Sequence, residues 1–184
     1  MSLSALSDHF CAKVYYYLAD LTAGKVALCF VCLWLVALLL RCSGKSEKRA
    51  RLFVFDLALC ACLTAILSVT LLGRKGTAIP DGSVFAFFEA LRDGTRIDYY
   101  DIFFNAALFL PLGLLLGLRC SMGRACLLTF LCSLAVETLQ LLTGRGMFEA
   151  SDLLFNTLGG ALSAGIALGW RALRSRLSRR KSNP

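Results

Sequence analysis

Three pairs of polar residues and one arginine interrupt or flank the long apolar runs of this sequence. The members of each pair are three or four positions apart, so each pair lies on one face of a helix. A charged residue at the centre of a membrane helix costs about 2.5–3.5 kcal/mol on insertion scales, so it needs a partner or a watery cavity. The set consists of Asp101 and Asn105, Glu137 and Gln140, Asp152 and Asn156, and Arg145.

This set could bind an anion or carry out acid–base chemistry. The Arg145 guanidinium can grip a phosphate, pyrophosphate or carboxylate through two parallel hydrogen bonds. Glu137 or Asp152 could act as a general acid or base, although the sequence shows no constellation of Ser, Cys or His residues that would supply a nucleophile beside them. The structural alternative is that Arg145 bridges the two carboxylates. We favour a functional pocket, because interhelical polar bonds contribute only about 0.6 kcal/mol on average in membranes.

Composition places the chain in a lipid bilayer. Of its 184 residues, 58% are hydrophobic and 17% are charged, whereas soluble domains have about 45–50% apolar and about 25% charged residues. Collagen, disorder and a small disulfide scaffold are excluded. The formal net charge is +8, but Lys and Arg cluster beside apolar runs instead of forming one stripe, so we expect no nucleic-acid partner.

Five apolar runs approach or reach the roughly 17–25 residues that cross a bilayer as a helix. They must be helical, because hydrocarbon offers no partner to unpaired backbone groups. We therefore predict an all-α, polytopic helical bundle with about five transmembrane helices and short interfacial helices. The predicted spans are Val26–Leu40, Leu52–Leu72, Ile102–Leu118, Ala125–Leu142 and Leu153–Trp170. Ser83–Asp93 is predicted as a surface helix with Ser83 as its N-cap.

Orientation follows from the basic residues, because cytoplasmic loops carry an excess of Lys and Arg. Thirteen of the 20 lie in segments 41–51, 119–124 and 171–184, and the others lie in segments 1–25, 73–101 and 143–152. We therefore expect the N-terminus outside and the C-terminus in the cytoplasm. In this orientation the three polar pairs share the outer side of the membrane.

Small residues within the runs predict close helix packing. We expect Pro111 to remove a backbone hydrogen bond and kink its helix. Cys29 and Cys32 have the spacing of metal ligands, but no second pair accompanies them and zinc needs four donors, so we expect neither a metal nor a cofactor. The glycines expected to permit close approach are Gly113, Gly117, Gly159, Gly160 and Gly165.

These residues, in this order and spacing, resemble the VanZ-like family of bacterial membrane proteins. The likeness covers about residues 75–170 and consists of the run NAALFLPLG from Asn105 to Gly113, Glu137-x2-Gln140, Arg145, and Asp152-x3-Asn156-x2-Gly159-Gly160. The name-giving member is associated with low-level teicoplanin resistance. The family usually has four spans, so the additional N-terminal run departs from its pattern.

The resemblance suggests three segments. Residues 1–72 hold an interfacial segment and two transmembrane helices, 73–170 form a VanZ-like domain with a surface helix and three transmembrane helices, and 171–184 are a basic cytoplasmic tail. We expect a multi-pass protein of the bacterial cytoplasmic membrane.

Three functions stay open. The favoured one is binding of an envelope lipid, a lipid-linked cell-wall precursor or a glycopeptide at the outward pocket, with a contribution to glycopeptide resistance. The second is an intramembrane enzyme that acts on a lipid-linked substrate through Glu137 and Asp152. The third is a small transporter, for which a homo-oligomer could supply more helices. Membrane lipids are the expected partners in all three.

Overall fold

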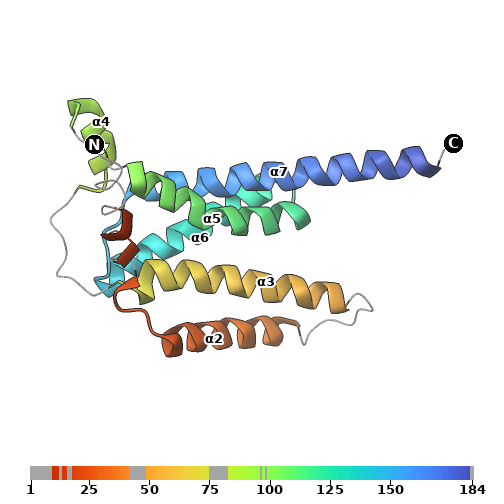
Figure 1. Cartoon of the computed structure of the whole chain (residues 1–184), viewed down its shortest axis with the longest axis horizontal. Coiled ribbons are helices and arrows are strands. Elements are labelled where there is room, and N and C mark those ends of the chain that lie inside the picture. The colour runs from red at the N-terminus through yellow and green to blue at the C-terminus, as the bar shows by residue number, and fades with distance from the viewer. Residues whose placement is uncertain are drawn as a thin grey trace. The chain divides into compact units, whose positions relative to one another are not determined.

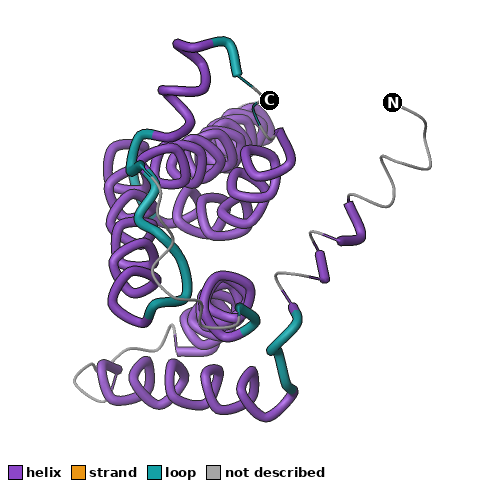
Figure 2. Tube along the Cα trace, turned by 90° about the vertical axis from the view of Figure 1, so that its left-hand side faces the viewer, coloured by secondary structure: helices purple, strands orange, loops and turns teal. Residues whose placement is uncertain are grey.

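The described part of the chain consists of helices and the loops that join them (Figure 2). The computed structural model describes residues 10–12, 14–15, 18–41, 49–74, 83–95, 97 and 99–182. The predicted all-α membrane class is confirmed. In chain order (Figure 1), the elements are α2 (Ala23–Arg41), α3 (Arg49–Leu67), the π-helix η1 (Ser68–Leu72), α4 (Ala86–Asp93), α5 (Tyr99–Arg119), α6 (Met122–Thr143) and α7 (Ala150–Ser182).

Four described segments are long and apolar enough to cross a membrane, and they overlap the second to fifth predicted spans. The first predicted span forms α2, but the described apolar part of this helix, Ala23–Leu38, is shorter than the other four. Helix α7 continues beyond Trp170 into the basic tail, because residues 171–182 contain no glycine or proline and are rich in good helix formers. The four candidate spans are Phe53–Leu72, Tyr99–Arg119, Met122–Thr143 and Ala150–Arg179.

The chain divides into two compact units, and α6 contributes to both. The first unit contains Met1–Thr95 and Ala135–Glu149, and the second contains Arg96–Leu134 and Ala150–Pro184. The first unit therefore holds α2, α3, η1, α4 and the last part of α6. The second unit holds α5, α7 and the first part of α6.

In the first unit, α2 and α3 pack antiparallel. The rings of Trp34 and Phe53 meet edge to face, with centroids 4.9 Å apart. Near the opposite ends of the two helices, the Asp20 N–H donates to the Gly73 carbonyl at 2.9 Å. Lys25, which directly precedes the apolar run of α2, bonds through Nζ to the Asp20 carboxylate at 2.5 Å and to the Asp20 carbonyl at 2.8 Å. This pair anchors the start of α2.

Helix α3 continues without interruption into the π-helix η1, which consists of the five residues Ser68–Leu72. The Gly73 N–H donates to the Ser68 carbonyl at 2.7 Å, which is the i to i−5 bond of a π-helix. The Thr70 hydroxyl donates to the Ile66 carbonyl at 2.7 Å. Single π turns inside α-helices occur frequently at functional sites, and this one lies at the end of a candidate membrane span.

In the second unit, α5 and α7 lie side by side at backbone contact (Figure 1). A Cβ on Gly113 would overlap the Gly160 carbonyl, and a Cβ on Gly159 would overlap the Ala106 carbonyl. A Cβ on Gly117 would lie 2.6 Å from the Ala164 carbonyl oxygen. These glycines occupy the positions where the two helices are closest, and α5 continues through Pro111 without a break.

Gly165 departs from the expectation for packing glycines. A Cβ there would meet no described atom within 4 Å. Residue 165 is exposed, so it lies on a face of α7 that these helix contacts do not use. The expectation of a close helix approach at Gly165 is therefore corrected.

The contacts of the second unit also give the helix directions. Successive contacts advance together along α5 and α7, from Ala106 with Gly159 to Gly117 with Ala164, so these helices run parallel. Helix α6 runs antiparallel to α7, because Thr129 meets Gly160 whereas Ser133 meets Asn156. This alternation is the one expected of three consecutive membrane spans.

Helix α4 is the predicted surface helix, but it begins later than predicted. Its N-cap is Phe85, so the prediction that Ser83 caps the helix is wrong. The Ser83 hydroxyl instead accepts a hydrogen bond from the Phe85 N–H at 3.1 Å and donates to the Glu89 carboxylate at 2.8 Å. Ser83 thus stabilises the turn that precedes the helix.

Candidate functional site

The turn that ends α6 fixes the position of Arg145. Gly144 has a φ of +63°, a conformation that glycine adopts at little cost. Its N–H donates to the Leu141 carbonyl at 3.3 Å, and the Arg145 N–H donates to the Gln140 carbonyl at 3.0 Å. This pair of bonds is the Schellman arrangement at a helix C-terminus. The turn at Thr143-Gly144 therefore reverses the direction of the chain, and this reversal brings the backbone of Arg145 next to Gln140.

Arg145 and Gln140 both bind the end of η1. The Nη1 atom of Arg145 donates to the Leu71 carbonyl at 2.7 Å, and Nε2 of Gln140 donates to the Thr70 carbonyl at 3.1 Å. The last carbonyls of a helix lack partners within it, and a cation near a helix C-terminus stabilises it by about 0.3–1 kcal/mol. We call Thr70, Leu71, Gln140 and Arg145 the η1 cap.

Glu137 and Gln140 are each only 1% exposed. The Glu137 carboxylate accepts a hydrogen bond from the Glu149 N–H at 3.1 Å, which ties the loop after α6 back to that helix. The Oε1 atom of Gln140 is also buried and has no hydrogen-bond partner among the described residues. Leaving such an acceptor unsatisfied costs about 1–3 kcal/mol. A hydrogen-bond donor on a ligand would therefore gain a favourable interaction with the Gln140 Oε1 atom.

A second guanidinium, that of Arg74, lies near the cap. Its Nη1 atom is 3.0 Å from the position that a Cβ on Gly146 would take, and the side chain of Gln140 is 3.4 Å from the same position. The absence of a side chain at Gly146 leaves room for Arg74 next to Gln140. From the sequence, Arg74 was expected only as one of the basic residues of the segment 73–101. Its position two residues after the apolar run that ends at Leu72 was the signal that could have identified it.

The other predicted site residues lie in the second unit. The Nδ2 atom of Asn105 donates to the Asp152 carboxylate at 2.6 Å, which joins α5 to α7. Asn156 is 2% exposed and its Nδ2 donates to the Ser133 hydroxyl at 2.9 Å, which joins α7 to α6. Asp101 and Asp152 lie in the first turns of α5 and α7, where a carboxylate interacts favourably with the helix dipole.

The structure thus places the seven predicted residues in two groups. Arg145 bonds to a carbonyl at the end of a helix, a partner that was not expected from the sequence. Glu137, Gln140 and Arg145 belong to the first unit, and Asp101, Asn105, Asp152 and Asn156 belong to the second.

Arg171 has a role that was not expected from the sequence. It was assigned to a basic tail, but its Nη1 atom donates to the carbonyls of Gly117 at 3.0 Å and Cys120 at 3.2 Å. It therefore satisfies the end of α5 much as Arg145 satisfies the end of η1.

Comparison with known proteins identifies one similarity. A family model described as VanZ/LLP1 matches residues 68–171, which is more than half of the chain. The match begins at the first residue of η1 and ends at Arg171, so it contains the whole η1 cap. No curated protein and no solved structure matches the chain.

Proposed function

The chain belongs to the VanZ/LLP1 family, and from the contacts of the η1 cap we propose that it binds an anionic group at the outer face of the bacterial cytoplasmic membrane. The ligand is the phosphate or carboxylate of an envelope lipid or of a lipid-linked cell-wall precursor. Its capture changes how a glycopeptide reaches the cell surface and contributes to teicoplanin-type resistance.

The geometry of Arg145 is the observation that supports this proposal most. A guanidinium has five N–H donors in a planar fork. In the described residues Arg145 uses one nitrogen, Nη1, on the Leu71 carbonyl. The other donors can meet a phosphate or carboxylate, while the bond to η1 holds the side chain in place. Such preorganisation lowers the entropy cost of binding.

Gln140 adds a requirement on the ligand. Its Oε1 atom, which has no partner in the described part of the chain, is an acceptor within the same cap. A ligand that offers an anion to Arg145 and a hydroxyl or amide N–H to Gln140 would satisfy both groups. Phosphoglycerol head groups and phosphorylated sugars have this combination, whereas a choline head group has no hydrogen-bond donor.

The proposal requires the turn after α6 to face outward, which cysteine labelling can test. Met147 lies in that turn and Met122 lies at the other end of α6. In a background without native cysteines, we expect an impermeant thiol reagent to label Met147→Cys in intact cells and to label Met122→Cys only after permeabilisation. The reverse pattern would contradict the proposed orientation.

Teicoplanin susceptibility tests the contribution to resistance. We expect Arg145→Lys to insert and express normally yet to lose most of the protection in a host that the unmodified protein protects. A lysine can still donate to the Leu71 carbonyl, but it cannot reproduce the planar fork. Arg124→Lys is the matched control, because Arg124 is an exposed residue near the other end of α6. Equal protection by the two variants would contradict the proposed role of Arg145.

A further inference from the structure

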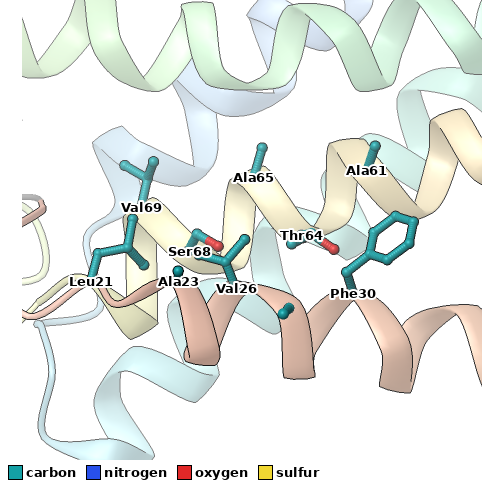
Figure 3. A pocket seen from close by; sticks show the side chains of 10 residues that line it. Leu21, Ala23, Val26, Phe30, Ala61, Thr64, Ala65, Ser68 and Val69 are labelled. Atoms are coloured by element: carbon teal, nitrogen blue, oxygen red, sulfur yellow. The ribbon is translucent and has the colours of Figure 1, made fainter.

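A groove between α2 and α3 lies in the same unit as the η1 cap. Its volume is about 710 Å³, within the roughly 300–1,000 Å³ typical of ligand pockets. Its α3 and η1 side extends from Ala61 to Val69, or about 12 Å at 1.5 Å per residue. Figure 3 shows Phe30 at one end and Leu21 near Val69 at the other. The lining is almost entirely apolar, so the groove suits an elongated hydrocarbon.

Two polar side chains line this groove, Thr64 and Ser68, and the hydroxyl of each is buried without a hydrogen-bond partner among the described residues. The Ser68 side chain lines the groove, Ser68 is 5% exposed, and its hydroxyl has no hydrogen-bond partner among the described residues. A helical serine can usually bond to the carbonyl four residues before it. Ser68 is also the first residue of η1, and it stands toward the Leu21 end of the groove (Figure 3). Of the two, the Ser68 hydroxyl is the one nearer the η1 cap in sequence, and it is a donor that an ester or phosphate oxygen can use.

The groove and the η1 cap meet in consecutive residues of one helix turn. Ser68 and Val69 line the groove, and the next two carbonyls, those of Thr70 and Leu71, are bound by Gln140 and Arg145. A molecule with an anionic head group and an apolar chain could therefore place its chain in the groove and its head group at the η1 cap, at consecutive residues of the same helix turn.

We infer that the groove between α2 and α3 holds a hydrocarbon chain of the membrane lipid whose anionic head group meets the η1 cap. The inference rests on the proposed function and makes it more specific, because it assigns the ligand to lipids and not to water-soluble anions. The bilayer around α3 supplies such chains, and the Ser68 hydroxyl donates to an oxygen where the chain joins the head group.

The test compares long-chain and short-chain phosphatidylglycerol, which share a head group. Purified protein is given both lipids at equal concentration, and native mass spectrometry measures the ratio of the two bound species. Ala27 lines the groove. The adjacent Leu28 is not among the lining residues and is 66% exposed. Ala27→Phe therefore fills the groove, and Leu28→Phe is its matched control on the same helix.

We expect the unmodified protein and Leu28→Phe to favour the long-chain lipid, and Ala27→Phe to lose this preference. Ser68→Ala should weaken long-chain binding by roughly two- to tenfold, which corresponds to one hydrogen bond, and should not reduce thermal stability. Equal chain-length preference in Ala27→Phe and Leu28→Phe would overturn the inference.

The two proposals fail in different ways. If the groove inference is wrong, Ala27→Phe leaves the chain-length ratio unchanged whatever Arg145→Lys does. If head-group binding is wrong, Arg145→Lys leaves the preference for phosphatidylglycerol over phosphatidylcholine unchanged, even where Ala27→Phe alters the chain-length ratio.

Discussion

Replacing Gly113 with alanine is expected to prevent α5 and α7 from packing. The added Cβ would overlap the Gly160 carbonyl and would lie 2.5 Å from the Gly160 Cα. These are backbone atoms, so no side-chain rotation can relieve the clash. Overpacking in a tight core costs typically 1–3 kcal/mol and occasionally more. We expect a loss of about 3 kcal/mol here, since two whole helices would have to separate.

Gly165→Ala is the matched control for this substitution. It makes the same chemical change on α7, at a position where a Cβ meets no described atom within 4 Å. Alanine favours a helix over glycine by about 1 kcal/mol, so the control should be neutral or slightly stabilising. Thermal unfolding of both variants in detergent provides the measurement. Equal melting temperatures would contradict the close approach of α5 and α7.

The membrane-helix architecture could be predicted from the sequence because it depends on long apolar runs, which are local features. The second to fifth spans follow from this rule, and Figure 1 shows that each becomes a continuous helical segment. The end of α7 was harder to predict. An apolar run marks where a span stops, but a basic tail of good helix formers continues the same helix.

The contacts of the candidate site were less predictable, because they involve backbone groups. The spacing of Glu137 and Gln140 on one helix face was readable. The partners of Gln140 and Arg145 were not, since these partners are carbonyls at the end of a π-helix about 70 residues earlier in the chain. Carbonyls are present at every residue, so no sequence pattern distinguishes the ones that a distant arginine will bind.

The same limit applies to the acidic residues. From the sequence, a bridge from Arg145 to Glu137 and Asp152 was one open alternative, and Asn105 was not considered as a partner of Asp152, to which it donates a hydrogen bond within the second unit. In both pairings Asp152 is a carboxylate near a helix end that accepts a hydrogen bond. An amide and a guanidinium are both donors, so the choice between them depends on tertiary packing, which residue spacing alone does not determine.

The central claim is that Arg145 of the η1 cap selects an anionic lipid head group, and competitive lipid binding tests it most directly. Purified protein is equilibrated with equal amounts of phosphatidylglycerol and phosphatidylcholine that carry the same chains, and native mass spectrometry measures the bound ratio. We expect the unmodified protein and Arg124→Lys to retain phosphatidylglycerol about tenfold over phosphatidylcholine, which corresponds to about 1.4 kcal/mol. This is close to the energy of one hydrogen bond to a charged group. Arg145→Lys should bind the two lipids nearly equally, because the planar fork has donors for both the phosphate and a glycerol hydroxyl oxygen, which choline lacks, whereas a point charge holds only the phosphate that both lipids share. The same bound ratio in Arg145→Lys and Arg124→Lys would contradict the claim.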